Sequence, residues 1–318
     1  MIAVLGAGAF GTALAVAIAQ SGQEVQLWAR DLDQVAKMNA TRRNEARLPG
    51  VTLPESVILT SALPTAAEAI LLALPMQALR RALPDLAKTL NGLPIVACCK
   101  GIDLVTGQGP TSLILQACPK STAAILTGPS FATEIALGLP TALTLACADD
   151  GTGQRLQQMI STLTLRIYRT TDVIGAELGG ALKNVIAIAA GVVIGAGLGQ
   201  SARAALMTRG YAEMVRVAHA LGARTDTLAG LSGLGDLMLT CNSDQSRNFL
   251  FGQALAAGVA LDPAMTVEGV ATAQAMVAIA SKFDLELPVM AMVAALTQGE
   301  IDLQDAIHAL LSRPLKQE

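Results

Sequence analysis

Residues 1–20 read MIAVLGAGAFGTALAVAIAQ, a short apolar run followed by Gly6-Ala7-Gly8-Ala9-Phe10-Gly11 and then by an Ala-rich stretch. The run Ile2–Leu5 predicts a buried strand, and the stretch from Thr12 to Gln20 predicts a helix. Glycines with this spacing between a strand and a helix permit a tight turn and close packing of the helix on the strand. The stretch therefore predicts the first strand, loop and helix of an α/β fold.

The glycine loop also has the properties of a phosphate-binding site. Glycines let the backbone approach a pyrophosphate closely, and the positive N-terminal end of the following helix attracts its negative charge. A GxGxxG pattern alone is a weak signal, but here a strand precedes it and a helix follows it, so we expect Gly6, Gly8 and Gly11 to bind a dinucleotide. The alternative is a glycine-rich turn that serves packing alone.

The choice of dinucleotide depends on Trp28-Ala29-Arg30-Asp31, at the end of the second predicted strand. An acidic side chain here hydrogen-bonds the ribose 2′-hydroxyl of NAD, whereas an arginine can pair with the 2′-phosphate of NADP. Arg30 comes first after the strand, and Asp31 can instead cap the next helix. We therefore expect NADP to be accepted, with NAD as the alternative or additional cofactor.

The first half of the chain alternates short apolar runs with helical stretches. Runs without strict polar alternation suit strands that are covered on both faces, and strands that alternate with helices predict a parallel, doubly wound sheet of the Rossmann type. The runs rich in Val, Ile and Leu are Ile2–Leu5, Glu24–Trp28, Ala69–Leu74, Pro94–Cys98, Ala123–Leu126 and Ala142–Ala146.

The chain changes character near Asp172, beyond which we find helical patterns and no convincing strand. We therefore predict a Rossmann-like dinucleotide-binding domain in residues 1–175 and an all-helical substrate-binding and catalytic domain in residues 176–318. The predicted helices are Glu177–Gly199, Ala202–Leu221, Arg247–Ala257, Val267–Lys282 and Leu303–Leu311.

Charge and hydropathy limit the classes of partner. The 318 residues include 22 Lys and Arg and 25 Asp and Glu, a formal net charge of −3, so nucleic acid is not an expected partner. Hydrophobic residues make up 52% and the mean hydropathy is +0.51, which raises a membrane-embedded protein as an alternative. The most apolar segment, Val185–Gly199, is shorter than the ~20 residues of a membrane span and is flanked by Lys183 and Arg203, so we expect a buried helix and no stable membrane insertion.

The N-terminus and the cysteines indicate a cytoplasmic protein. No basic residue precedes the first apolar run, in contrast to a signal peptide. The five cysteines are odd in number and form neither a CxxC motif nor a cluster with His219 or His308. We therefore expect reduced, structural thiols and no metal site.

Charged side chains in apolar surroundings mark the rest of the candidate site, because burying an unpaired charge is unfavourable. Lys100 follows the predicted strand Pro94–Cys98, at the edge where open α/β sheets bind ligands. Lys183 and Asn184 stand side by side near the start of the apolar helix, so one side chain can face a substrate while the other orients the first side chain or touches the nicotinamide. The alternative for Lys100 is a surface lysine in a loop, and the alternative for Lys183 is a structural lysine whose amine reaches the surface.

Three further segments offer polar groups. Thr127-Gly128-Pro129-Ser130-Phe131-Ala132 follows the next strand and begins a predicted helix, with Pro129 in its first turn and a Ser or Thr as cap. Asp236 stands in a glycine-bounded loop, and Arg247, between Ser246 and Asn248, presents a planar donor fork that matches phosphate. The alternative for the segment that begins at Thr127 is a simple helix cap, and the alternative for Arg247 is a surface salt bridge.

Taken together, these segments resemble the soluble bacterial type of NAD(P)-dependent glycerol-3-phosphate dehydrogenase. They come in the family's order and span nearly the whole chain, and GPSFA, LKNV and GLGDL with SRN are far more specific jointly than the glycine loop. The segments that carry the resemblance are GAGAFGTALA from Gly6, CCKGI from Cys98, GPSFATEIALGLPTALTLA from Gly128, ALKNVIAIAAG from Ala181, ALMTRGYAEM from Ala205, GLSGLGDLMLTC from Gly230, SRNFLFG from Ser246 and VEGV from Val267.

The resemblance implies a Rossmann-like domain followed by an all-α domain like the C-terminal domain of 6-phosphogluconate dehydrogenase. It implies reversible reduction of dihydroxyacetone phosphate to sn-glycerol 3-phosphate with NADPH or NADH, which supplies glycerophospholipid synthesis. Lys183 is then the general acid and base. Burial and a nearby cation such as Lys100 would lower its pKa, whereas Asp236 would oppose that shift and fix the amine.

The resemblance also implies two sets of binding residues, with Arg247 and Asn248 as the phosphate anchor. The residues around the substrate are Lys100, Gly128, Ser130, Lys183, Asn184, Asp236, Ser246, Arg247 and Asn248. The residues at the cofactor are Gly6, Gly8, Ala9, Phe10, Gly11, Arg30, Lys100, Ala132, Arg247, Thr266 and Glu268. The many Ala-rich helices favour a homodimer formed through helices.

The match departs from the family between Val192 and Arg203, where the family reads close to IxDGLGxGxNAKAAL. Here Ile194 replaces an acid and Ser201 replaces an amide. If those groups order a loop over the site, turnover or loop closure differs in this chain. The implied proton-transfer and phosphate-binding positions are all present.

Two other functions use the same architecture. A related reductase that acts on a hydroxyacid is the main alternative, because one fold serves several reactions. A dinucleotide-binding sensor without catalysis is the second, and the presence of both Lys183 and Asp236 argues against it.

Overall fold

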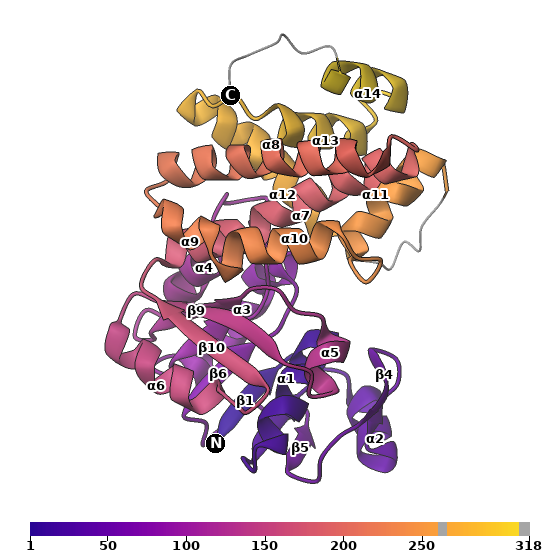
Figure 1. Ribbon diagram of the computed structural model, residues 1–318. Coiled ribbons are helices and arrows are strands. Elements are labelled where there is room, and N and C mark those ends of the chain that lie inside the picture. The colour runs from indigo at the N-terminus through magenta and orange to yellow at the C-terminus, as the bar shows by residue number, and fades with distance from the viewer. Residues whose placement is uncertain (260–265, 312–318) are drawn as a thin grey trace.

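The computed structural model describes residues 1–259 and 266–311, the last three of these by their backbone alone. A sheet flanked by helices forms the N-terminal half, and layers of helices form the C-terminal half, which lies above the sheet in Figure 1. The Rossmann-like sheet followed by a helical C-terminal part confirms the predicted fold class.

Eight strands form the main sheet in the order β10-β9-β8-β7-β6-β1-β2-β5. In β1, Ile2 and Val4 enter the hydrophobic core on one face, while Ala3 and Leu5 enter the core on the other face, and all four are buried. The continuous apolar run is thus explained by a strand covered on both sides. The strands are β1 (Ile2–Leu5), β2 (Val25–Trp28), β5 (Val57–Thr60), β6 (Ala69–Leu72), β7 (Ile95–Ala97), β8 (Ala123–Thr127), β9 (Thr141–Cys147) and β10 (Leu165–Thr170).

Six helices and a separate hairpin complete this half. The two-stranded hairpin pairs β3 (Arg43–Asn44) with β4 (Leu48–Thr52) and follows α2 in the chain. The helices are α1 (Ala9–Gln20), α2 (Leu32–Thr41), α3 (Met76–Leu90), α4 (Pro110–Ala117), α5 (Ala132–Ala136) and α6 (Asp150–Ile160).

The expectation of a fully parallel sheet is wrong at one pair of strands. β9 runs antiparallel to β8, whereas β10 is parallel to β9. A parallel return from β8 requires a connection that spans the whole sheet. The five-residue helix α5 is only ~7.5 Å long, against ~17 Å for a five-residue strand, so the helix does not carry the chain back across the sheet, and β9 starts at the end where β8 finishes.

The C-terminal half is built around α7 (Val173–Gly195), which packs against several of the other helices. α11 lies along α7, and an ideal Cβ on Gly191 would stand only 2.1 Å from the carbonyl oxygen of Phe249, so the two backbones are in direct contact. The other helices are α8 (Gly199–Ala220), α9 (Thr225–Ala229), the π-helical turn η1 (Leu231–Gly235), α10 (Asp236–Cys241), α11 (Arg247–Ala257), α12 (Glu268–Phe283), α13 (Pro288–Gln298) and α14 (Leu303–Leu311).

α7 is the segment whose hydropathy raised a membrane protein as an alternative. Among the described residues it is the one helix long and apolar enough to cross a bilayer, with a mean hydropathy of 1.8 over its most apolar window. Of that window, 89% is buried inside the protein, so α7 is a core helix, as expected. It ends at Gly195 rather than at the predicted Gly199, because positive φ values of 72° at Gly197 and 87° at Gly199 interrupt the helix.

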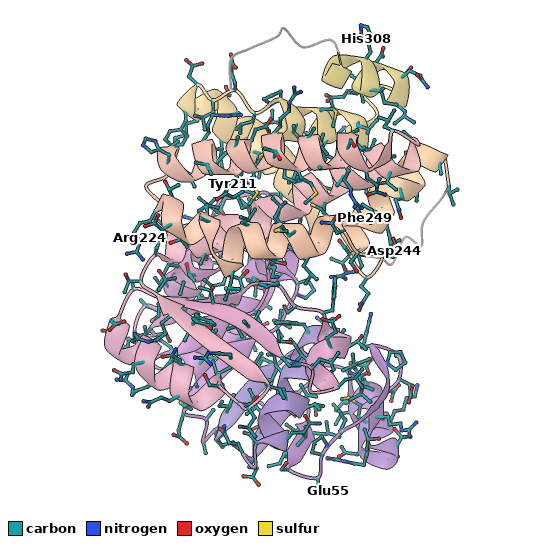
Figure 2. The ribbon with its side chains drawn as sticks, in the orientation of Figure 1. Glu55, Tyr211, Arg224, Asp244, Phe249 and His308 are labelled. Atoms are coloured by element: carbon teal, nitrogen blue, oxygen red, sulfur yellow. The ribbon has the colours of Figure 1, made fainter. Side chains whose placement is uncertain are left out.

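The two halves meet where β10 passes into α7. Asp172 caps α7 by accepting a hydrogen bond from the Gly175 N–H at 2.9 Å, and its other oxygen accepts the Arg224 N–H at 2.8 Å. Figure 2 shows Arg224 at this boundary, where its guanidinium also donates to Oγ1 of Thr170 at 2.6 Å. These bonds fix the start of α7 against the end of the sheet.

Candidate functional site

The glycine loop connects β1 to α1 at the edge where the parallel strands end. An ideal Cβ on Gly11 would stand 2.1 Å from the Gly6 carbonyl oxygen, so only glycine fits there. Gly8, the N-cap of α1, has an extended backbone with φ −78° and ψ −177°, and a Cβ placed on it meets nothing within 4 Å. No side chain caps the first amides of α1. The open space at Gly8 and the uncapped helix end fit a pyrophosphate group.

Arg30 and Asp31 follow β2, next to the glycine loop in the sheet order. Asp31 is the N-cap of α2, and its Oδ1 accepts the Asp33 N–H at 2.9 Å and the Gln34 N–H at 3.2 Å. Arg30 is exposed. The structure thus bears out the interpretation that Asp31 caps the helix, and it leaves the side chain of Arg30 at the surface.

Two lysines and one aspartate from distant parts of the chain meet beside the sheet. Nζ of Lys183, in α7, lies 3.1 Å from Oδ1 of Asp236 at the start of α10, and Nζ of Lys100, which follows β7, lies 2.5 Å from Oδ2 of the same residue. Asp236 is 1% exposed and Lys183 is 7% exposed. The three residues that the sequence singled out for catalysis therefore form one cluster, in which Lys183 and Asp236 are buried and Lys100 is half-buried.

Thr240 is a member of this cluster that the sequence analysis missed. Nζ of Lys183 donates to Oγ1 of Thr240 at 2.6 Å, and this hydroxyl donates to Oδ1 of Asp236 at 3.2 Å. The signal was the spacing of four residues between Asp236 and Thr240, which places both side chains on one face of α10. Lys183 is therefore fixed by two partners from a single helical turn.

Burial and neighbouring charges shift the pKa values of both Lys183 and Asp236. Burial and the nearby charge of Lys100 lower the pKa of Lys183, Asp236 acts in the opposite direction, and the net result is a pKa of about 8. Burial of Asp236 opposes its ionisation, but Lys100 and Lys183 outweigh that effect and lower its pKa. Near neutral pH the carboxylate is thus charged, and the amine can both bind and release a proton.

Lys100 also reaches the loop after β8. Its Nζ donates to the carbonyl oxygen of Gly128 at 3.0 Å, and Oγ of Ser130 donates to the same oxygen at 3.2 Å. The prediction that Pro129 lies in a helical turn is wrong, because α5 begins only at Ala132 and no side chain caps it. A positive φ of 138° at Gly128 turns the chain sharply, so Pro129 and Ser130 stay outside the helix.

The polar neighbours of Lys183 and Arg247 are bonded to each other. Nδ2 of Asn248 donates to Oδ1 of Asn184 at 3.0 Å, and Oδ1 of Asn248 accepts the Gly269 N–H at 3.0 Å. The hydroxyl of Ser246 caps α11 by accepting the Phe249 N–H at 3.2 Å. Asn184 and Asn248 therefore link α7, α11 and α12, and Ser246 caps α11, whereas Arg247 is exposed.

Glu268 joins the helical half to the sheet half. Its Oε1 accepts the Met76 N–H, at the start of α3, at 3.3 Å. Burial raises the pKa of Glu268, while the Met76 bond and the charge of Arg247 oppose that shift. Glu268 and Arg247 therefore belong to one electrostatic neighbourhood. Thr266, two residues earlier, is exposed.

The sheet order separates the predicted site residues into three groups. Arg30 follows β2, Gly8 follows β1, and Lys100 follows β7, with β6 between β1 and β7. Neighbouring strands lie ~4.8 Å apart, so the ends of β2 and β7, which Arg30 and Lys100 follow, are about 14 Å from each other along the sheet edge. Phe10, in α1, and Ala132, in α5, are half-buried, and these two helices contact each other beside the glycine loop. A dinucleotide is long enough to cross this edge.

Within the part of the chain that the structure describes, no three His, Cys, Asp or Glu side chains are grouped so that they could hold a metal ion. All five cysteines are free thiols and buried.

The chain matches two family models over most of its length. Residues 1–152 match the N-terminal model of NAD-dependent glycerol-3-phosphate dehydrogenase, and residues 172–308 match its C-terminal model. Curated relatives named glycerol-3-phosphate dehydrogenase [NAD(P)+] include those of Cereibacter sphaeroides, 63% identical over 100% of both chains, and Ruegeria sp., 56% identical over 100% of this chain and 99% of the relative.

Solved structures give the same grouping. The crystal structure of glycerol-3-phosphate dehydrogenase from Coxiella burnetii is 35% identical, with a TM-score of 0.92 and 98% of each chain covered. A ketopantoate reductase from Ralstonia eutropha, 17% identical with a TM-score of 0.64 over 97% of this chain and 100% of that chain, shares the fold alone. The chain belongs to the NAD-dependent glycerol-3-phosphate dehydrogenase family.

Proposed function

We propose that the chain reduces dihydroxyacetone phosphate to sn-glycerol 3-phosphate reversibly, with Lys183 as the group that transfers the proton. The observation that carries this assignment is the cluster of the buried Lys183 and Asp236 with the half-buried Lys100, at the edge of the sheet where the glycine loop also lies. This edge is the usual ligand-binding edge of an open α/β sheet. Membership in the family supports the reaction itself.

Lys183 acts as the general acid in the direction of reduction. When NADPH or NADH is bound, its dihydronicotinamide supplies the hydride for the substrate's carbonyl carbon. The ammonium of Lys183 gives a proton to the carbonyl oxygen, and in the reverse direction the neutral amine removes it. A pKa of about 8 suits both roles, because an acid and base works best when its pKa lies near the working pH.

Asp236, Thr240 and Lys100 prepare Lys183 for this step. Asp236 and Thr240 hold Nζ in place through bonds of 3.1 and 2.6 Å. Lys100 balances the carboxylate, so a neutral Lys183 does not leave Asp236 without a counter-ion. Lys100 is also half-buried, so it can face the substrate while it supports the loop at Gly128.

Arg247 is the proposed anchor for the substrate phosphate. It is exposed at the first position of α11, where the guanidinium fork and the positive helix end both favour a phosphate. The engaged side chains of Ser246, Asn248 and Asn184 fix the backbone around it. Together with Gly128 and Ser130, these residues form the proposed substrate site.

The cofactor site uses the glycine loop and the loops that follow β2 and β7. Gly6, Gly8, Ala9, Phe10 and Gly11 would hold the pyrophosphate, and Arg30 would pair with the 2′-phosphate of NADPH, since Asp31 is engaged as a helix cap. The remaining proposed cofactor contacts are Lys100, Ala132, Arg247, Thr266 and Glu268. We propose that NADPH is preferred and that NADH is also used.

The setting of the reaction follows from the chemistry and the composition. The product is a building block of glycerophospholipids, and a cytoplasmic homodimer is the proposed form of the enzyme.

The proposed division into domains at residue 175 lies just inside α7, which begins at Val173 after β10 ends at Thr170.

The direct test is oxidation of NADPH and of NADH by the purified protein in the presence of EDTA. The loss of near-ultraviolet absorbance monitors the oxidation. Oxidation that depends on dihydroxyacetone phosphate, and not on ketopantoate or a 3-oxoacid, is the expected result. No oxidation with either cofactor, by folded protein that binds NADPH, would contradict the assignment and favour a hydroxyacid reductase.

A further inference from the structure

A buried amide from the hairpin contacts the glycine loop. Asn44, in β3, is 3% exposed, although β3 and β4 take no part in the main sheet. Its Nδ2 donates to the carbonyl oxygen of Ala7 at 3.0 Å and to Oγ1 of Thr12 at 2.8 Å. One side chain thus bonds both the glycine loop and the first turn of α1.

A second amide supports the first. Nε2 of Gln34, in α2, donates to the same Ala7 carbonyl oxygen at 2.9 Å and lies 3.4 Å from Oδ1 of Asn44. The Ala7 carbonyl therefore accepts two hydrogen bonds from side chains outside the loop. A carbonyl with both acceptor positions engaged has little freedom to rotate, so the orientation of its peptide plane is fixed.

The orientation of this peptide decides where the next amide points. In a planar trans peptide the C=O and the N–H point in opposite directions, so the Gly8 N–H points away from Asn44 and Gln34. Gly8 is the position where an added Cβ would meet no atom within 4 Å. The two side chains therefore hold the Gly8 N–H outward, on the opposite side of the loop from the hairpin.

We propose that Asn44, supported by Gln34, is a positioning residue for the nicotinamide cofactor, fixing the Ala7–Gly8 peptide so that its N–H binds the pyrophosphate. This inference rests on the dinucleotide site of the proposed function. Asn44 itself is buried beneath the loop and acts on the cofactor only through the backbone of Ala7 and Gly8.

The hairpin has anchors of its own, so a change at Asn44 can be tested in a folded protein. Leu48, Val51 and Leu53 are buried in the core of the sheet. The Leu53 N–H donates to the Arg42 carbonyl at 2.8 Å, and the Arg42 guanidinium donates to the carbonyl oxygens of Val57, at 3.1 Å, and of Pro54. These contacts do not involve the Asn44 side chain.

The experiment compares Asn44→Ala with a matched control, Gln26→Ala. Gln26 is also a buried amide of this half, and its Nε2 donates to the Ala62 carbonyl at 3.1 Å, away from the glycine loop. The dissociation constant of NADPH is measured by fluorescence without substrate, and thermal stability is measured in parallel. Calorimetry with ADP-ribose, which has the pyrophosphate but no nicotinamide, gives a second affinity.

Asn44→Ala is expected to weaken NADPH and ADP-ribose binding by about fivefold, which corresponds to the ~1 kcal/mol of a buried hydrogen bond. At saturating NADPH, kcat and the KM for dihydroxyacetone phosphate should stay within about twofold of wild type. Gln26→Ala should lower thermal stability without weakening NADPH. Gln34→Ala, at a half-buried position, should weaken NADPH binding by about threefold. If Asn44→Ala does not fold, the NADPH affinity of Gln34→Ala tests the inference instead, and an unchanged affinity would overturn it.

Unchanged NADPH affinity in folded Asn44→Ala, or an equal loss in Gln26→Ala, would show a purely structural role and overturn the inference. The proposed function fails in a different way, through wild-type protein that binds NADPH but does not reduce dihydroxyacetone phosphate. Since the binding measurements contain no substrate, the two results are separable.

Discussion

Nζ of Lys183 lies 3.1 Å from Oδ1 of Asp236, inside the protein and away from bulk water. Because Lys100 binds the other oxygen of Asp236, one carboxylate balances two ammonium groups. With both lysines protonated this cluster carries one net positive charge, and it becomes neutral when Lys183 gives up its proton. Burial disfavours a net charge, so the cluster is poised to release that proton.

The rate of each direction should follow the protonation of Lys183 in opposite ways. The pKa of Lys183 is lowered to about 8, so the ammonium needed for reduction predominates below that pH and the amine needed for oxidation predominates above it. We expect kcat for reduction to fall as the pH rises through about 8, and kcat for oxidation to rise over the same interval. Initial rates at saturating cofactor check this, and a reduction rate that stays level well above the pKa would contradict it.

Asp236→Asn should move both profiles to lower pH. Asp236 raises the pKa of Lys183, while burial and Lys100 lower it, so loss of the carboxylate removes the main effect that raises the pKa. An opposite charge at this distance changes a pKa by about 1–2 units. Titration of the rate of reduction measures the shift. Thr240→Ser, which keeps the hydroxyl that contacts Lys183, is the control and should keep the wild-type profile.

Gly8→Ala should weaken cofactor binding, whereas Gly11→Ala should destabilise the fold. A Cβ at Gly8 meets nothing within 4 Å, so the variant should fold with wild-type stability. Its methyl group occupies the proposed pyrophosphate position, so NADPH should bind at least about tenfold more weakly. A Cβ at Gly11 would stand 2.1 Å from the Gly6 carbonyl oxygen, so Gly11→Ala should lower the melting temperature. Tight NADPH binding by Gly8→Ala would place the cofactor elsewhere.

Arg30→Ala and Asp31→Ala separate cofactor choice from helix capping. Loss of the exposed Arg30 should raise the KM for NADPH by about tenfold and leave the KM for NADH unchanged. Asp31→Ala removes the cap of α2 and should cost ~1 kcal/mol of stability without a preference between cofactors. A selective loss of NADH in Asp31→Ala would instead identify Asp31 as the residue that reads the ribose.

The two strands of the main sheet that the sequence analysis missed share a physical cause. β5 and β10 form the two edges of the sheet, and their residues alternate between buried and exposed. A search for continuous apolar runs finds strands covered on both faces, such as β1, and passes over edge strands. The helices α11 and α14 were predicted with their observed bounds, because an apolar face at helical spacing is a strong local signal.

The residues of the site were predictable one by one, and the resemblance implied that Lys100 and Asp236 lie near Lys183, but the full set of contacts was not predictable. Lys100, Lys183 and Asp236 stood out because charges are rare in this chain, yet only folding brings β7, α7 and α10 together. Thr240 gave no such signal, since a threonine is unremarkable in an apolar helix. The short contact between Asp236 and Lys100 could not be read from residues 136 positions apart.

The decisive measurement is kcat for reduction of dihydroxyacetone phosphate by Lys183→Ala, together with the dissociation constant of NADPH for the same variant. General acid–base groups contribute about 100- to 10,000-fold in rate, so kcat should fall by a factor in that range while NADPH binding stays close to wild type. A wild-type kcat in a variant that binds NADPH normally would remove Lys183 from the proton transfer.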